Sequence, residues 1–330
     1  MSAAGAILVI RLSSLGDVLL CAPALRALRR RFPDSQIDFL VASGFADAAR
    51  LLPEINNLIT LDRNEGWRGL LRLRRLLSRQ YELIVDLQNS PRSAFLRLAC
   101  MPLMWTKSNR FRIKRWFLIR FKWNFYGATV PVPIRYIRAL DSLGVVDDEL
   151  GLELLHTHGP RDEQMIVLCP GAKHFTKRWP VENWQELVSR LESSGWKITV
   201  CGSADEADAC RSIAGNHPVV VGTALSDVGG LLARARAVVC HDSGLMHLAT
   251  GVGTPVVALF GPTVEQFGFF PFRADALVVQ QPLACRPCSA FGGNVCPKRH
   301  HDCMRQTTPD QVMSTLSQLL AIGHDRQTSL

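Results

Sequence analysis

The chain has 330 residues and a net charge of +9, with 47% hydrophobic and 20% charged residues. This length is more than one ordinary hydrophobic core needs and suits two domains. The composition is that of a globular protein, and no stretch approaches the roughly 18 uncharged apolar residues of a membrane-crossing helix. The N-terminus lacks the basic flank and long apolar region of a signal peptide, so we expect a cytoplasmic protein. A basic protein is expected to have acidic partners.

Apolar runs and helical spacing alternate along the first half of the chain. The expected strands cover residues 7–10, 37–42, 58–61 and 83–87. The expected helices cover residues 17–32, 46–52 and 67–77. Because Pro23 is unfavourable inside a helix, we expect the regular part of the first helix to start close to Pro23 after an initial turn, or to kink there. Strands and helices that alternate at this pace are typical of a doubly wound parallel sheet.

A second alternation follows a helical and acidic stretch at 134–154 and a linker at 156–160. Its expected strands cover residues 165–169, 197–201, 219–221, 237–240 and 255–260. Its expected helices cover residues 181–193, 206–214, 225–233 and 245–250. We therefore predict an α/β protein with two Rossmann-like domains, at 1–156 and 157–330. Two such domains create an interdomain cleft, which is a preferred place for a ligand.

Asp17 follows the first strand at the point where a helix should begin. Ligands of parallel sheets collect beyond the carboxyl ends of the strands, so this position suits a catalytic carboxylate. The alternative is that Asp17 only complements the positive end of the following helix.

The segment 237–247 predicts a buried strand, a tight turn and a helix. Ser243 and Gly244 fall at the helix N-terminus, where unpaired backbone N–H groups and the helix dipole bind phosphate. Alternatively, Asp242 and Ser243 form a simple N-cap pair, and His247 is a core histidine.

A basic loop, residues 170–180, follows the first strand of the second half. Its cations Lys173, Lys177 and Arg178 could neutralise a diphosphate without a metal, or the loop could simply be solvated. Thr263 ends a neighbouring strand and brings a hydroxyl to the same sheet edge.

Four motifs together resemble glycosyltransferase family 9, the heptosyltransferases. They are Arg11-Leu-Ser-Ser-Leu-Gly-Asp17-Val, Pro170-Gly-Ala with Lys177-Arg-Trp-Pro180, His241-Asp-Ser-Gly-Leu-Met-His247, and Phe260-Gly-Pro-Thr263. Their order and spacing match over nearly the whole chain. The resemblance implies a GT-B fold, an ADP-heptose donor and an acceptor in the inner core of lipopolysaccharide that carries acidic Kdo sugars or an earlier heptose. It assigns residues 1–156 to the acceptor, and residues 157–330, which end in a helix, to the nucleotide sugar. It also implies inversion at the anomeric carbon with no cofactor or divalent metal required for catalysis.

The resemblance also implies roles for individual residues. Asp17 matches the general base, and Lys177 matches the lysine that contacts the donor phosphate. The other residues assigned to donor binding are Arg178, Asp242, Ser243, Gly244, His247 and Thr263. Ser13 and Ser14, in the loop before Asp17, are assigned to acceptor binding.

Ten cysteines are present. Six lie in apolar segments and are expected to be reduced core residues: Cys21, Cys100, Cys169, Cys201, Cys210 and Cys240. The other four, Cys285, Cys288, Cys296 and Cys303, fall within nineteen residues. Such a cluster suggests a structural zinc site, although its irregular spacing equally allows reduced thiols or a redox-labile pair.

The segment 107–123 interleaves cations with aromatic residues. This pattern suits an anionic membrane interface, or single-stranded nucleic acid, or an ordinary helix with a solvated basic face. Because the segment falls in the half assigned to the acceptor, we expect it to bind acidic lipopolysaccharide core or the inner leaflet. The cations concerned are Arg112, Lys114, Arg115 and Arg120.

The resulting hypothesis is an inverting heptosyltransferase, cytoplasmic and peripheral to the inner membrane, with no nucleic-acid partner. Two alternatives remain open. One is a GT-B transferase that uses another nucleotide sugar, and the other is a non-catalytic nucleotide-binding or nucleic-acid-binding module.

Overall fold

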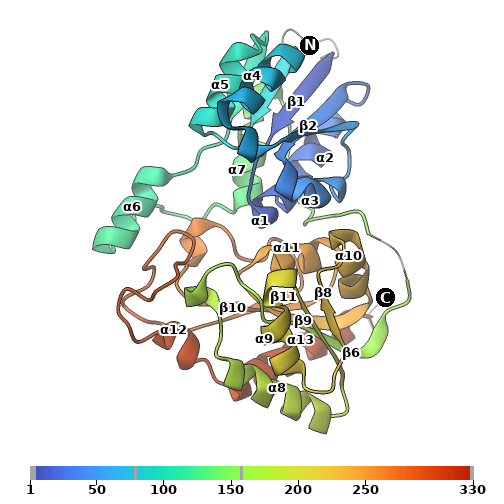
Figure 1. The fold of residues 1–330 in the computed structure, drawn as a ribbon, viewed down its shortest axis with the longest axis vertical. Helices are drawn as coiled ribbons and strands as arrows, with labels where there is room; N and C mark the ends of the chain where they lie inside the picture. The colour runs from blue at the N-terminus through green and yellow to red at the C-terminus, as the bar shows by residue number, and fades with distance from the viewer. Residues whose placement is uncertain (1–4, 78–79, 157–158, 328–330) are drawn as a thin grey trace. The chain divides into compact units, whose positions relative to one another are not determined.

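The computed structural model describes residues 5–77, 80–156 and 159–327. The chain packs as two units, each built on one parallel sheet (Figure 1). The first unit comprises residues up to Phe111 together with Val130–Leu155, and the second comprises Arg112–Thr129 together with the residues from His156 onward. The predicted class of two Rossmann-like units is confirmed. Residues 157 and 158 of the expected linker lie outside the described residues.

The first unit holds a five-stranded sheet in the order β3-β2-β1-β4-β5. Its strands are β1 (Ala6–Ile10), β2 (Gln36–Ala42), β3 (Asn57–Leu61), β4 (Leu83–Asp86) and β5 (Met104–Lys107). All four pairings are parallel. Ile7 to Ile10 are buried because a central strand is covered on both faces.

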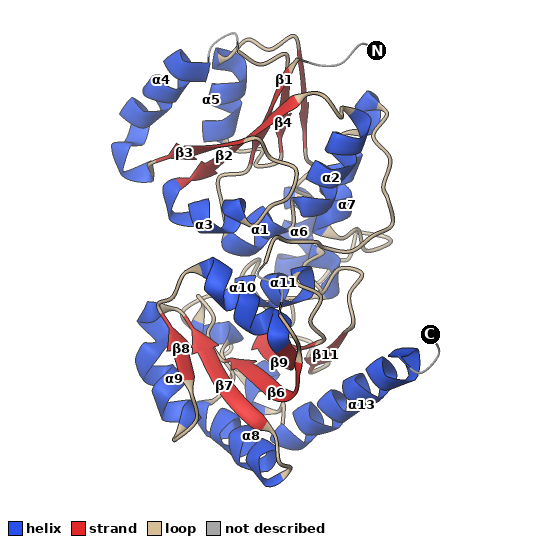
Figure 2. Ribbon diagram, turned by 90° about the vertical axis from the view of Figure 1, so that its right-hand side faces the viewer, coloured by secondary structure: helices blue, strands red, loops and turns tan. Residues whose placement is uncertain are grey.

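Helices cover both faces of this sheet (Figure 2). They are α1 (Leu15–Leu19), α2 (Ala22–Arg31), α3 (Ala46–Arg50), α4 (Gly66–Leu77), α5 (Pro91–Ala99) and α7 (Val132–Arg138). Leu70, Leu73 and Leu77 of α4 share a core with Leu8 and Ile10 of β1. The expected helix at 17–32 is divided because Pro23 falls in the first turn of α2, where a missing N–H costs nothing.

The second unit holds a six-stranded sheet in the order β11-β10-β9-β6-β7-β8, again with parallel pairings. Its strands are β6 (Asp162–Cys169), β7 (Lys197–Gly202), β8 (Val219–Val221), β9 (Ala235–His241), β10 (Val256–Phe260) and β11 (Ala276–Gln280). Its helices are α6 (Arg112–Phe121), α8 (Val181–Ser193), α9 (Ala207–Ala214), α10 (Leu225–Arg234), α11 (Gly244–Gly251), α12 (Asp302–Arg305) and α13 (Pro309–Gln327).

The basic segment that contains α6 packs with the second unit, which differs from the expected single boundary at residue 156. Lys122 donates hydrogen bonds to the carbonyl oxygens of Cys285 (2.8 Å) and Pro287 (2.6 Å). The Arg115 guanidinium lies over the ring of Phe291 at 5.0 Å. These contacts join residues far apart in the sequence, so periodicity could not reveal them.

The six cysteines expected in the core are buried and reduced, as predicted. Among the residues that the structure describes, no helix is both long enough and apolar enough to cross a bilayer.

Candidate active site

Asp17 lies in α1, directly beyond the carboxyl end of β1. Its Oδ1 is 2.7 Å from Nη2 of Arg11. Its Oδ2 accepts hydrogen bonds from the hydroxyl (2.8 Å) and the backbone N–H (3.2 Å) of Ser14. The bond to the Ser14 N–H is one half of a capping box. The structure therefore gives Asp17 the capping role that was the alternative to catalysis, and it does not test the catalytic role.

The environment of Asp17 favours the carboxylate. Burial of the group by itself would raise its pKa, but the charge of Arg11 and the hydrogen bonds from Ser14 outweigh burial and lower the pKa below its ordinary value. Asp17 is therefore ionised at neutral pH, as a proton acceptor must be.

Three residues that support Asp17 were not singled out by the sequence. The other arm of Arg11 donates to the carbonyl of Leu87 (2.8 Å), beyond the end of β4. Gln88 accepts N–H groups of Leu12 (3.0 Å) and Ser13 (3.3 Å), which holds the loop before α1 in place. Tyr136 of α7 donates to Oδ1 of Asp17 at 3.5 Å. Gln88 could have been predicted to lie near Asp17, because it follows β4 and the carboxyl ends of neighbouring parallel strands meet at one sheet edge.

Ser13 and Ser14 both lie in this loop, as expected. Ser13 is partly buried and Ser14 is exposed. The hydroxyl of Ser14 donates a hydrogen bond to Asp17 and so orients the carboxylate.

In the second unit, three predicted donor-binding residues meet in one cluster. Lys177 Nζ lies 2.6 Å from Oδ2 of Asp242 and 3.1 Å from the Asp242 carbonyl oxygen. The hydroxyl of Thr263 donates to the same Oδ2 at 2.6 Å. Only 14% of the Lys177 side chain and 6% of the Asp242 side chain are exposed. The cluster joins the basic loop to the ends of β9 and β10.

The turn beside this cluster has the predicted form. Gly244 begins α11 and Ser243 is its N-cap. The Ser243 hydroxyl oxygen is buried without a hydrogen-bond partner among the described residues. His247 is buried in the same helix, at 2% exposure. The hydroxyl of Ser243 and the first N–H groups of α11 thus lie together at one helix N-terminus, where an anion is stabilised.

Arg178 is placed differently from the other predicted donor residues. Its Nε donates to the carbonyl oxygen of Ala172 (2.8 Å), so the side chain braces the basic loop.

His241 positions the basic loop, a role that the sequence did not indicate. It is fully buried at the end of β9, and its Nε2 accepts the backbone N–H of Trp179 at 2.9 Å. Its Nδ1 faces the carbonyl oxygen of Gly171 at 3.4 Å. Burial lowers the pKa of His241 to about 4, so the ring stays neutral and can accept the Trp179 N–H.

The cysteine-rich segment braces the same loop from another side. Thr176 and Gly293 exchange two hydrogen bonds, at 3.0 and 2.9 Å. His301 Nε2 lies 3.1 Å from the carbonyl oxygen of Thr176. The segment 285–303 therefore supports the loop that carries Lys177.

The four clustered cysteines lie near one another, but their side chains are not arranged as the ligands of a metal ion. Burial, reinforced by the neighbouring thiols Cys296 and Cys285, raises the pKa of Cys288. Burial and neighbouring cysteine thiols raise the pKa of Cys303 to about 12. Over residues 5–77, 80–156 and 159–327, no group of three or more His, Cys, Asp or Glu side chains could hold a metal ion. The residues as placed do not fit the predicted zinc, and no step of the chemistry is assigned to it.

The predicted acceptor-binding cations lie on or near α6. Arg115 contacts aromatic rings of the second unit, Phe267 at 5.9 Å and Phe291 at 5.0 Å. Arg120 lies over Phe121 at 5.5 Å. The aromatic residues of the segment also pack on one another, with Phe121 stacked on Trp123 at 5.1 Å. Arg112 and Lys114 belong to the same helix.

Two Rossmann-like units with a phosphate-type helix N-terminus are the features of the GT-B fold, and comparison with known proteins identifies the family. The profile of glycosyltransferase family 9 (heptosyltransferase) matches residues 143–293. Lipopolysaccharide heptosyltransferase 1 of Pseudomonas aeruginosa is 32% identical over 312 residues, covering 86% of this chain and 85% of the relative. Lipooligosaccharide heptosyltransferase 2 of Haemophilus ducreyi is 26% identical, covering 96% and 99%. The chain belongs to glycosyltransferase family 9.

Solved structures agree with this assignment. The Escherichia coli ADP-heptose lipopolysaccharide heptosyltransferase II has a TM-score of 0.71 at 25% identity, covering 96% of this chain and 99% of that one. A family 9 glycosyltransferase from Veillonella parvula has a TM-score of 0.80 at 20% identity, with 97% and 98% covered, and shares the fold.

Proposed function

We propose that this glycosyltransferase transfers a heptose from ADP-heptose to the inner core of lipopolysaccharide. The observation that carries the proposal is the Lys177–Asp242–Thr263 cluster beside the N-terminus of α11. Relatives named as lipopolysaccharide heptosyltransferases support the substrate class. A solved Escherichia coli heptosyltransferase that holds ADP-2-deoxy-2-fluoro heptose supports the donor.

The second unit would stabilise the leaving diphosphate. An ammonium group has three N–H donors, and Lys177 directs two toward Asp242. The third can donate to a phosphate oxygen, while the Gly244 N–H at the start of α11 and the Ser243 hydroxyl meet another. Charge that develops on the departing phosphate is thus met by groups already in place.

The first unit would activate the acceptor. As an acceptor hydroxyl oxygen bonds to the anomeric carbon, its proton passes to the Asp17 carboxylate, and the bond to the diphosphate breaks with its electron pair leaving on ADP. A single displacement of this kind inverts the anomeric centre. Because the pKa of Asp17 is low, we expect it to take the proton late, when the attacking oxygen has become acidic.

A panel of nucleotide sugars tests the proposal against its nearest rival. The protein is incubated with ADP-heptose, UDP-hexoses or GDP-hexoses and with core acceptors that end in Kdo or in heptose, and the products are identified by mass. We expect extension by one heptose with ADP-heptose alone. Extension with another donor would make the protein a different GT-B transferase, and binding of RNA without any transfer would favour the nucleic-acid module.

The pH dependence follows from the environment of Asp17. A carboxyl whose pKa lies below its ordinary value of 3.8 keeps its base form down to that pH. We therefore expect kcat/KM to show no loss attributable to Asp17 between pH 7 and about pH 4. A pH–rate profile measured over the range in which the protein stays folded checks this. An acid limb near pH 6 that disappears in Asp17→Asn would contradict it.

Transfer is expected to survive EDTA, because Lys177 and the N-terminus of α11 supply the positive charge that a magnesium ion provides elsewhere. Initial rates are compared with and without EDTA and with added magnesium. Strict dependence on magnesium would refute this expectation.

The cations of α6 are proposed to bind the acidic acceptor or the inner leaflet, which would make the protein peripheral to the membrane. Replacing Arg112, Lys114 and Arg120 with Gln should weaken binding to the acceptor or to anionic vesicles and leave ADP affinity unchanged. Arg115 is kept because it contacts Phe291, in the segment that supports the Lys177 loop. Each cation contributes about 1 kcal/mol near an anionic surface, and the effect should fade as salt rises. Vesicle co-sedimentation beside an ADP titration is the measurement. Unchanged sedimentation and acceptor KM would assign the helix to ordinary solvated surface.

A further inference from the structure

The outer face of α4 combines apolar and cationic side chains. Three large apolar residues there are exposed: Trp67 at 66%, Leu71 at 45% and Leu76 at 53%. The helix buries its other face, through Leu70, Leu73 and Leu77, on the sheet of the first unit. Burial of the inner face accounts for the helix, but it does not account for the exposed Leu71 and Leu76.

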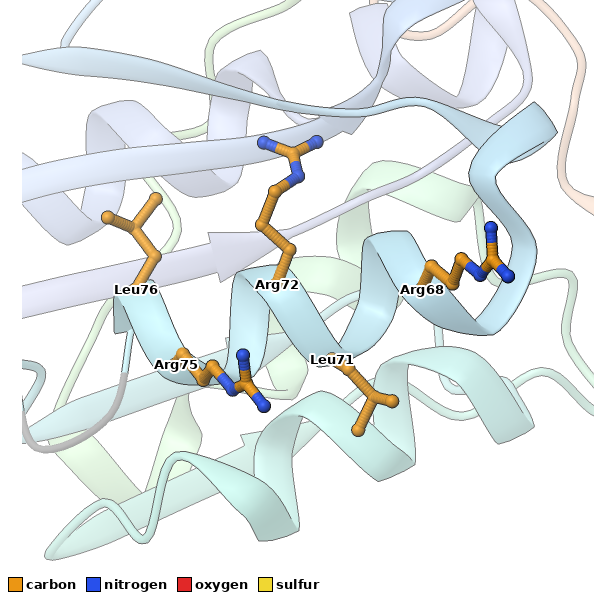
Figure 3. A pocket seen from close by; sticks show the side chains of 5 residues that line it. All are labelled: Arg68, Leu71, Arg72, Arg75 and Leu76. Atoms are coloured by element: carbon orange, nitrogen blue, oxygen red, sulfur yellow. The ribbon is translucent and has the colours of Figure 1, made fainter.

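The charge on this face has one sign. The helix contains four arginines and no acidic residue in twelve positions. Glu65, just before it, pairs with Arg72 at 3.0 Å. A surface hollow of about 680 Å³ is lined by Arg68, Leu71, Arg72, Arg75 and Leu76 (Figure 3). Guanidinium groups and leucine side chains project from the same stretch of helix in this view.

A neighbouring segment of the same unit is also apolar and exposed. α4 packs beside α5, and Trp67 contacts Phe95 edge to face at 5.6 Å. The chain from the end of α5 into β5 exposes Leu98 (69%), Leu103 (83%) and Trp105 (49%). β5 is an edge strand with largely exposed residues. Exposed apolar surface of this extent marks an interaction site.

We propose that the outer face of α4 docks the protein on an anionic lipid surface. Leucine and tryptophan side chains enter the boundary between headgroups and acyl chains, while arginines at the same height meet lipid phosphates. An acidic protein would satisfy the arginines, but an anionic bilayer satisfies both the arginines and the exposed side chains of Trp67, Leu71 and Leu76. The inference goes beyond the proposed function, because it requires no sugar transfer and concerns a helix other than α6.

The test is co-sedimentation of the full chain with vesicles of phosphatidylcholine alone or with phosphatidylglycerol, and without sugar nucleotide or acceptor. One variant, Arg68→Gln/Arg75→Gln, removes charge, and a second, Leu71→Ser/Leu76→Ser, removes apolar surface. The control, Arg50→Gln/Arg211→Gln, removes two exposed arginines elsewhere, on α3 and α9. α6 is intact in all of these proteins. Thermal unfolding confirms that each variant is folded.

We expect the wild type and the control to bind phosphatidylglycerol vesicles. The charge variant should bind about thirtyfold more weakly at low salt, with the difference shrinking as salt rises. The leucine variant should bind about tenfold more weakly at low and high salt alike. Binding of either variant at the wild-type level, or failure of the wild type to prefer anionic vesicles, would overturn the proposal. Since the assay contains no donor, its outcome is separate from that of the transfer assay.

Discussion

Asp17→Asn is expected to lower kcat by a factor on the order of 10² to 10⁴ while leaving ADP affinity unchanged. This is the usual contribution of a positioned general base. The amide keeps the shape of the side chain and can still accept hydrogen bonds from Ser14, but it cannot take the acceptor's proton. Product analysis measures the loss of transfer, and calorimetry with ADP measures donor-site integrity.

The cap and the charge of Asp17 need separate controls. Ser14→Ala removes the hydroxyl that donates to Oδ2 but leaves the carboxylate, so it should reduce activity far less than Asp17→Asn. Thermal unfolding of both variants separates a lost cap from lost chemistry, because replacing the carboxylate also leaves the buried Arg11 without its ion-pair partner. Near-normal turnover of a folded Asp17→Asn protein would leave only the capping role.

Lys177→Ala should weaken binding of ADP-heptose much more than binding of adenosine, because the lost contact is to phosphate charge. The ion pair with Asp242 is largely buried, so removing the lysine also leaves an uncompensated carboxylate. Breaking such a pair destabilises a protein by about 3–5 kcal/mol. Chemical denaturation and calorimetry with the two ligands measure both effects.

The double variant Lys177→Ala/Asp242→Asn separates the two roles of the lysine. Removing the orphaned charge should restore much of the stability, but it should not restore affinity for the diphosphate. If ADP-heptose and adenosine weaken equally in the single variant, Lys177 holds the loop rather than the phosphate. Recovery of ADP-heptose affinity in the double variant would lead to the same conclusion.

Most of the fold could be predicted because the central strands are continuous apolar runs. Segments 7–10, 166–169 and 256–260 are buried on both faces, and their continuous apolar composition already indicates this burial. The edge strands β5 and β11 were missed for the opposite reason, since their residues are largely exposed or only partly buried. The placement of α6 depends on contacts such as Lys122 with Cys285, which join positions 163 residues apart.

The candidate site was predicted where residue type and position in a turn suffice, and missed where a partner comes from another element. Ser243 and Gly244 could be placed at a helix N-terminus from local pattern alone. The pairing of Lys177 with Asp242 could not be predicted, because the two residues lie on different segments of the second unit. His241 belongs to a motif, but the sequence assigned it no function. The structure shows that its Nε2 accepts the backbone N–H of Trp179.

The central claim is tested most directly by following ADP release and heptose incorporation in reactions of wild-type protein and ADP-heptose with core acceptors that end in Kdo or in heptose. The account predicts one ADP released for each heptose transferred, with no release when the acceptor is omitted. Intact ADP-heptose after prolonged incubation, or ADP release that proceeds equally well without an acceptor, would contradict it.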